Sequence, residues 1–197
     1  DITGVNMFNQ KTGEWVFHAG PVFAEIVLAD EINRASPKTQ SALLEVMEEA
    51  QVTVDGVRRP APQPFMVIAT QNPVEQAGTY PLPEAQLDRF LMKTSIGYPS
   101  RSAMIDVLDG SASPDRSKNL RPIVSGQDIV AWAALASANH TDRAVLDYVA
   151  ALAEATRDDE SSLLGVSTRG AIGMVRCARV WAAAQGRNFV LPDDIKA

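Results

Sequence analysis

The chain has 197 residues, of which 46% are hydrophobic, and its formal net charge is −6. This length and composition suit one ordinary domain or two small ones with a sizeable core, and they exclude a disordered chain. No run of lysines and arginines stands out, so nucleic acid is not an expected partner. The single cysteine, Cys177, cannot form an internal disulfide, which favours a reducing, cytoplasmic location. No apolar run is long enough to span a membrane.

Strands and hairpins are expected in the first hundred residues. Alternating apolar residues over residues 1–24 and 51–64 flank turn sequences and predict two β-hairpins, the second with Asp55-Gly56 as its turn. The runs Ile26–Ala29 and Phe65–Ala69 do not alternate, so they predict strands buried on both faces, as in a parallel sheet. The other elements expected here are a helix beginning at Ser36-Pro37, a short helix from Pro83 through Phe90 and a strand over Thr94–Tyr98.

Alanine-rich helical patterns replace the strand patterns after Pro99. We therefore expect a domain boundary near residue 100, with an α/β domain over residues 1–100 and an all-α domain over residues 101–197. The expected elements of the second domain are a helix over Ala103–Leu108, a polar linker over Gly110–Pro122, and helices beginning after Ser125, near Thr141, after the cap Ser167 and at Pro192.

Two adjacent carboxylates, Asp30 and Glu31, follow the first apolar strand. Parallel sheets bind ligands beyond the carboxyl ends of their strands, where such a pair is costly unless a cation or water meets it. In the Walker B pattern of nucleotide hydrolases the first acid holds Mg²⁺, usually through water, and the second activates the attacking water. The alternative is a buried strand that ends in a solvated acidic turn.

Several segments together closely resemble the MoxR family of AAA+ ATPases. They are Glu25–Arg34 (EIVLADEINR), Val67–Pro73 (VIATQNP), Gly78–Phe90 (GTYPLPEAQLDRF), Ser167-Thr168-Arg169 and the closing stretch from Gly186 to Ile195. The resemblance covers nearly the whole chain, in the right order. It implies an α/β fold in which part of an AAA+ P-loop NTPase core, a parallel sheet with β-hairpin insertions, is followed by an all-α lid domain.

The resemblance also implies roles for individual residues. Asp30 and Glu31 match the Walker B pair, with Asp30 holding Mg²⁺ through water and Glu31 activating the attacking water. Asn72 matches sensor 1, which hydrogen-bonds the attacking water or the γ-phosphate. Arg89 matches the arginine finger that reaches the nucleotide of the neighbouring subunit, and Arg169 matches the sensor 2 arginine of the lid. Glu31, Asn72 and Arg89 would be catalytic, with ATP and Mg²⁺ as cofactors.

Simpler interpretations remain for these residues. Asn72 precedes a proline and would suit a turn. Arg89 could instead pair with Glu84 or Asp88, and either Arg176 or Arg179 could take the sensor 2 role. If Ser167 caps a helix, however, Arg169 lies in its first turn, where a cation opposes the helix dipole unless an anion is present. This position favours a phosphate partner. Arg34 is interpreted as a surface arginine.

The phosphate-binding loop of the family, G-x-x-x-x-G-K-[ST], is absent, because none of the twelve glycines is followed by lysine. Since that loop lies upstream in the family, we expect Asp1 to be an internal position of a longer protein. We also expect these 197 residues alone to show negligible ATPase activity.

The resemblance implies a homo-oligomeric ring, expected to be a hexamer, that couples ATP hydrolysis to remodelling or maturing protein complexes or to metal-cofactor insertion. Its partners would be protein clients and, often, a protein with a von Willebrand factor A domain. Two alternatives stay open: a non-catalytic assembly or binding module, and a magnesium-chelatase-like or DNA-acting ring ATPase. The acidic balance argues against DNA, and the fuller segment matches argue against the chelatase.

Overall fold

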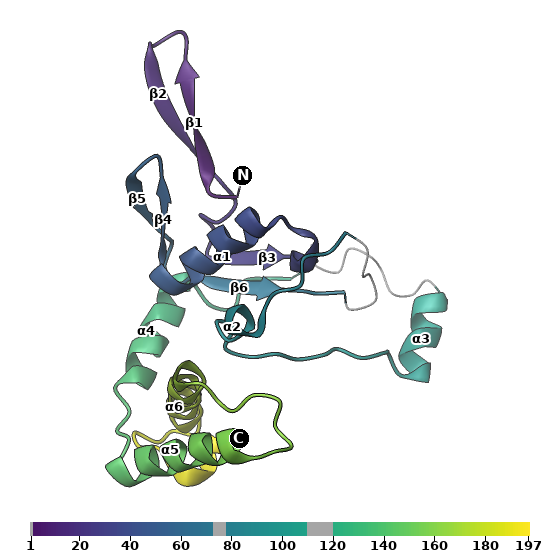
Figure 1. Ribbon diagram of the computed structural model, residues 1–197, viewed down its shortest axis with the longest axis vertical. Coiled ribbons are helices and arrows are strands. Elements are labelled where there is room, and N and C mark those ends of the chain that lie inside the picture. Colours follow the sequence, from purple (N-terminus) through teal and green to yellow (C-terminus); the bar gives the residue numbers. More distant parts are fainter. Residues whose placement is uncertain (1, 73–77, 110–119) are drawn as a thin grey trace. The chain divides into compact units, whose positions relative to one another are not determined.

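The computed structural model describes residues 2–72, 78–109 and 120–197. Two compact units make up the chain, one of Asp1–Leu91 with Gly126–Ala197 and one of Met92–Ser125. The mixed α/β fold with a parallel sheet confirms the expected fold class, and Figure 1 labels its elements. In chain order these are β1 (Gly4–Asn9), β2 (Glu14–Ala19), β3 (Ile26–Ala29), the 3₁₀ helix η1 (Ile32–Arg34), α1 (Pro37–Glu49), β4 (Gln51–Val54), β5 (Val57–Pro60), β6 (Met66–Ala69), α2 (Glu84–Leu87), α3 (Arg101–Leu108), α4 (Gly126–Ser137), α5 (Arg143–Asp158), α6 (Thr168–Ala184) and the 3₁₀ helix η3 (Pro192–Ile195).

The two predicted hairpins are confirmed. Strand β1 pairs antiparallel with β2, and β4 pairs antiparallel with β5. At the β4–β5 turn, Asp55 and Gly56 both have positive φ angles, of 50° and 78°, as a two-residue hairpin turn requires. The hairpins also touch each other, because the Asn6 amide donates to the Asp55 carboxylate at 2.5 Å and the Arg59 guanidinium lies 3.6 Å from the centre of the Phe17 ring.

Strands β3 and β6 form a parallel pair, with Ile26 opposite Met66 and Ala29 opposite Ala69 (Figure 1). One face packs against the core that α1 builds, through Val27, Ala29, Val67 and Ala69. The prediction that these strands are buried on both faces was wrong for this chain. The opposite face is exposed, because the described residues contribute two strands to this sheet and cover only one of its faces; its exposed side chains are Ile26 (63%), Leu28 (66%), Met66 (56%) and Ile68 (45%).

Helix α1 begins as predicted, with Ser36 as its cap and Pro37 as its first residue. The Ser36 hydroxyl accepts a hydrogen bond from the backbone N–H of Thr39 at 3.3 Å. On the inner side of the helix Gln40 is only 4% exposed. Its side-chain amide donates to the carbonyl of Ile32 at 3.0 Å and to that of Tyr80 at 2.8 Å. The helix thereby fixes the chain that follows β3.

Helices α4, α5 and α6 with η3 form the helical part that follows residue 125. Asp142 caps α5 by accepting from the N–H of Ala144 at 2.8 Å, and Ser167 caps α6 by accepting from the N–H of Gly170 at 2.9 Å. The buried core of this part consists of Val145, Ala178, Ala182 and Val190. The helices predicted after Ser125, near Thr141, after Ser167 and at Pro192 are thus present, the last as a 3₁₀ helix.

Three other expectations met different outcomes. The strand over Thr94–Tyr98 was wrong: these residues have no regular structure, Ile96 is fully exposed, and Gly97 has a φ angle of 68° that breaks an extended run. Helix α2 ends at Leu87, earlier than expected. Most of the linker Gly110–Pro122 lies outside the described residues, and the boundary near residue 100 stays a prediction.

No helix in the described part of the chain is long and apolar enough to cross a membrane.

Candidate functional site

Asp30 and Glu31 lie directly beyond β3, beside the residue that follows β6, which is Thr70. The Thr70 hydroxyl donates to a carboxylate oxygen of Asp30 at 2.5 Å and accepts from the backbone N–H of Glu31 at 2.9 Å. The Thr70 backbone donates to the carbonyl of Ala29 and accepts from the N–H of Ile32, both at 3.0 Å. One threonine therefore fixes both the chain and the first carboxylate of the pair.

The backbone of Glu31 adopts a left-handed conformation, with φ 49° and ψ 50°. A residue other than glycine or asparagine rarely takes these angles, and such strain is concentrated at functional sites. The two neighbouring acids have different partners, Thr70 for Asp30 and Arg34 for Glu31. The Glu31 carboxylate is 37% exposed and forms an ion pair with Arg34 at 3.1 Å. Arg34 thus has a close partner in the candidate catalytic acid itself.

Asn33, two residues after Glu31, contacts Asn72, the candidate sensor 1 residue. The side-chain amide of Asn33 donates to the backbone carbonyl of Asn72 at 3.2 Å, and the carbonyl of Asn33 accepts from the N–H of Tyr80 at 2.6 Å. Asn33 is 8% exposed, and its own side-chain oxygen is buried without a hydrogen-bond partner. The structure therefore brings Asp30, Glu31 and the backbone of Asn72 to one edge of the sheet, since the carboxyl ends of parallel strands lie together.

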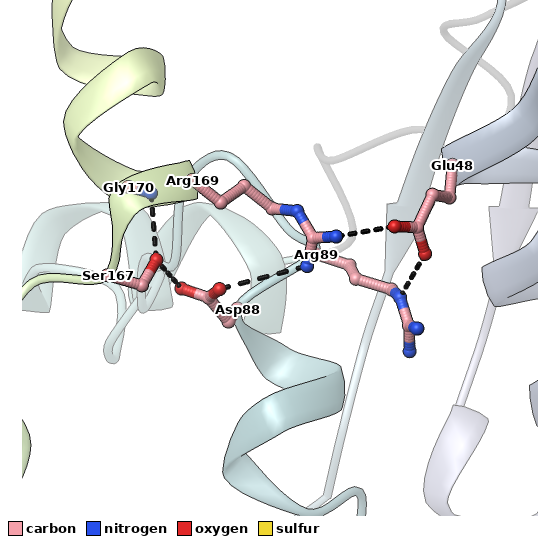
Figure 2. A network of polar contacts seen from close by, with 6 residues as sticks. All are labelled: Glu48, Asp88, Arg89, Ser167, Arg169 and Gly170. Atoms are coloured by element: carbon pink, nitrogen blue, oxygen red, sulfur yellow. Dashed lines mark hydrogen bonds and ion pairs between the residues drawn. The ribbon is translucent and has the colours of Figure 1, made fainter.

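Arg89 and Arg169 come together at a second place, around Glu48 of α1 (Figure 2). The Nε of Arg89 donates to one oxygen of the Glu48 carboxylate at 2.8 Å. A terminal nitrogen of Arg169 donates to the other oxygen at 2.5 Å. One carboxylate thus binds two guanidinium groups that lie 80 residues apart in the sequence, as 169 − 89.

Asp88 adds a second connection between the same two segments. Its carboxylate accepts from the hydroxyl of Ser167 at 2.7 Å and lies 3.7 Å from a terminal nitrogen of Arg169 (Figure 2). The Ser167 hydroxyl is also the cap of α6. The cap, the arginine in the first turn and the dipeptide Asp88-Arg89 therefore form one polar network.

The network perturbs the carboxylate at its centre. The hydrogen bond from Arg89 is the largest cause that holds the pKa of Glu48 below its usual range; desolvation opposes it, and the charges of Arg169 and Arg89 lower the pKa further. Glu48 stays ionised wherever the protein is folded near neutral pH, so it offers both arginines a full negative charge.

Several features of the site were missed in the sequence. Thr70 could have been found from the register of two parallel strands that both end in alanine, since residue 70 then lies opposite residue 30. Glu48 gave no signal beyond its place on a charged helix face. The alternative pairing of Arg89 with Glu84 or Asp88 was wrong, because its partner is Glu48. Arg179 donates to the Thr141 hydroxyl at 3.0 Å inside the helical part, which makes Arg169 the better sensor candidate.

The residues at the sheet edge fit a magnesium ion. Mg²⁺ takes hard oxygen ligands and is commonly held by one or two carboxylates, with water and substrate phosphates completing its shell. Asp30 supplies one fixed carboxylate, and Glu31 is its neighbour. The described residues contain no group of three or more histidine, cysteine or acidic side chains placed to hold a metal, so the remaining ligands would come from water and nucleotide.

Two family profiles match the chain. The profile described as "ATPase family associated with various cellular activities (AAA)" matches residues 1–92, and an AAA lid domain profile matches residues 154–197. A crystal structure of a candidate ATPase from Cytophaga hutchinsonii superposes with a TM-score of 0.85 at 40% identity, covering 100% of this chain and 62% of that one. Fold and profiles together define an AAA-type α/β domain followed by its lid.

Curated relatives narrow this class. Chaperone MoxR1 of Mycobacterium tuberculosis is 41% identical over 99% of this chain and 54% of its own length, and protein MoxR of Paracoccus denitrificans is 32% identical over 90% of this chain and 59% of its own. YeaC of Bacillus subtilis is 47% identical over 100% of this chain and 61% of its own length. The chain belongs to the MoxR family of AAA+ ATPases, and it spans little more than half the length of these relatives.

Proposed function

We propose that the protein of which this chain is a part hydrolyses ATP, with Asp30 and Glu31 as its acid pair. The observation that carries this proposal is that the Thr70 hydroxyl hydrogen-bonds both residues, the carboxylate of Asp30 and the backbone N–H of Glu31, at the carboxyl edge of the β3–β6 pair. Asp30 would hold Mg²⁺ through water, and Glu31 would take a proton from the attacking water. Bound magnesium would neutralise charge on the phosphates.

Asn72, Arg89 and Arg169 complete the proposed machinery. Asn72 would orient water or the γ-phosphate, because an amide both donates and accepts hydrogen bonds. Arg89 and Arg169 of one subunit would together stabilise charge on the phosphoryl group being transferred in a neighbouring subunit. None of the contacts described above joins the Glu48 group of arginines to the Asp30 group. This separation supports two half-sites that meet between subunits.

A ring of subunits follows from an arginine that serves a neighbour's nucleotide, and we propose a homo-oligomer of hexameric type. A relative is named as a chaperone, so we propose protein clients that the ring remodels or matures, with insertion of a metal cofactor as one such task. A protein with a von Willebrand factor A domain is a candidate partner, and the cytoplasm is the proposed location. The exposed hairpin β1–β2, where Trp15 is 70% exposed, offers apolar side chains for such contacts.

The test uses the full-length protein, extended upstream through the expected phosphate loop. Wild type should hydrolyse ATP in the presence of Mg²⁺. Glu31→Gln should bind ATP but turn it over about 10²- to 10⁴-fold more slowly, because the amide cannot accept the proton of water. Glu45→Gln makes the same chemical change at an exposed site on α1 and should leave turnover unaltered.

Two results would contradict the proposal. Unchanged turnover in Glu31→Gln would remove Glu31 from the reaction, and no ATP binding by wild type would favour a non-catalytic assembly module. For the 197-residue chain alone we propose negligible turnover, since no G-x-x-x-x-G-K-[ST] loop occurs in it. Clear turnover by this chain would contradict that part.

A further inference from the structure

Glu48 does not belong to the machinery assigned so far, yet it touches both arginines of that machinery. Its side chain is 42% exposed, and the side chains of Arg89 and Arg169 are 31% and 45% exposed. Ion pairs this exposed contribute little to the free energy of unfolding, because water screens the two charges. Stabilisation of the fold therefore does not account well for these two ion pairs, and we consider instead how they position the two arginines.

The geometry leaves the terminal nitrogens of Arg89 available to a further anion, whereas the terminal nitrogens of Arg169 face the carboxylates of Glu48 and Asp88. The bond from Arg89 uses Nε, and Figure 2 shows the two terminal nitrogens of Arg89 on the side of the group away from Glu48. An arginine held in this way keeps its fork of terminal N–H groups for a phosphate. Without a carboxylate between them, two like charges would repel each other and separate. Glu48 offsets that repulsion.

We propose that Glu48 is a positioning residue that holds Arg89 and Arg169 as one pair, so that both guanidinium groups reach the same phosphate. This inference rests on the proposed ATPase function and deepens it. Glu48 would not touch the nucleotide itself. Its role is to tie the first turn of α6 to the segment after α2, so that the lid and the core deliver their arginines together.

Asp88 supports the same arrangement from the other side. It binds Ser167 and lies near Arg169, so the start of α6 is held at two points rather than one. The hollow beside Glu48 is lined by Arg89 as well, so the Arg89 guanidinium borders an open space next to the carboxylate that holds it.

The experiment compares full-length wild type, Glu48→Gln and the control Glu45→Gln, which makes the same change one turn earlier on the same helix. Labelling of arginines by a dicarbonyl reagent, read by peptide mass spectrometry, reports whether the pair is held. In Glu48→Gln we expect several-fold faster labelling of both Arg89 and Arg169. Arg143, at the exposed start of α5, serves as the internal reference and should not change.

Steady-state ATP turnover is measured on the same samples. We expect kcat of Glu48→Gln to fall about 10- to 100-fold, with KM for ATP and binding of a non-hydrolysable analogue unchanged, because a small misplacement of a catalytic group costs rate rather than affinity. A merely structural role would lower the fraction of active protein or weaken binding. Glu45→Gln should behave as wild type in both measurements.

The outcomes separate the two proposals. If labelling of Arg89 and Arg169 does not change, or if it rises while kcat stays at the wild-type value, the positioning role of Glu48 is overturned and the ATPase proposal stands. If labelling of only one arginine rises, the two are not held as a pair, and the inference is likewise overturned. If the full-length wild type shows no turnover at all, both proposals fail together.

Discussion

Thr70 donates a short hydrogen bond of 2.5 Å to Asp30 across two neighbouring parallel strands. The same hydroxyl accepts from the N–H of Glu31, so its hydrogen is committed to the carboxylate. Thr70→Val keeps the shape of the side chain and removes both bonds. In the full-length protein we expect about 10- to 100-fold lower Mg²⁺-dependent ATP turnover, because outer residues that orient a metal-binding carboxylate have effects of this size. The measurement is turnover as a function of Mg²⁺ concentration.

Thr70→Ser is the matched control, because it keeps the hydroxyl and loses one methyl group. Its turnover should stay near that of wild type. Equal losses in Thr70→Val and Thr70→Ser would assign the effect to packing rather than to the hydrogen bond.

Arg89→Ala should abolish most turnover of the full-length protein while ATP binding persists. An arginine that stabilises the charge of phosphoryl transfer is worth about 10³–10⁵ in rate. Mixing Arg89→Ala subunits with Glu31→Gln subunits provides the sharper test. Mixed rings should regain part of the activity, since some interfaces then combine an intact Glu31 with an intact Arg89. Mixtures as inactive as either parent would contradict action between subunits.

Gln40→Leu should destabilise the chain by about 1–3 kcal/mol, because the buried carbonyls of Ile32 and Tyr80 lose a donor. Urea unfolding followed by circular dichroism measures this difference. Gln127→Leu, at an exposed position of α4, makes the same substitution and should change the free energy of unfolding by less than about 0.5 kcal/mol. Similar losses in both variants would mean that the substitution, and not the buried bonds, is responsible.

Asp194 gives the helical part a dependence on pH. Its side chain is 4% exposed and accepts from Arg187 at 2.5 and 2.7 Å and from the N–H of Leu191 at 2.7 Å. The hydrogen bonds from Arg187 come first among the causes that hold the pKa of Asp194 below its usual range. A lowered carboxyl pKa stabilises the fold above the unfolded value and ceases to do so as the pH falls through the folded value.

Asp194→Asn should therefore lower the free energy of unfolding by about 2–4 kcal/mol at pH 7. The difference from wild type should begin to shrink below about pH 4, the ordinary pKa of an unfolded aspartate, and should be lost as the pH falls through the lower pKa of the folded state. Urea titrations at several pH values measure it. Asp193→Asn, whose side chain is 88% exposed, is the neighbouring control and should have little effect at any pH. A difference that does not change with pH would contradict the role of the charge.

The sequence was most informative where a local signal decides the structure. The caps Ser36 and Ser167 and the turn Asp55-Gly56 act within a few residues, and each was correctly predicted. The strand at Thr94–Tyr98 failed because a strand also needs a partner, which no local pattern can supply. The prediction that Ile26 and Leu28 are buried failed for a similar reason, since burial depends on which other segments pack against the strand.

The candidate site follows the same division. The acids Asp30 and Glu31 stand out by their place after an apolar strand, whereas the pairing of Glu48 with Arg89 and Arg169 joins residues 41 and 121 positions apart. Contacts at such separations depend on how α1, the segment after α2 and α6 pack. Neither the periodicity of α1 nor the composition of α6 specifies that packing, so Glu48 stayed unnoticed.

The left-handed backbone of Glu31 sets stability against activity at a single position. A glycine there would adopt φ 49° without a Cβ clash, and the exposed ion pair with Arg34 that it would lose is worth little. The chain is therefore expected to tolerate Glu31→Gly with no loss of free energy of unfolding, although the change removes the proposed base. Selection for stability alone would accept glycine at this position, whereas selection for ATP turnover would reject it.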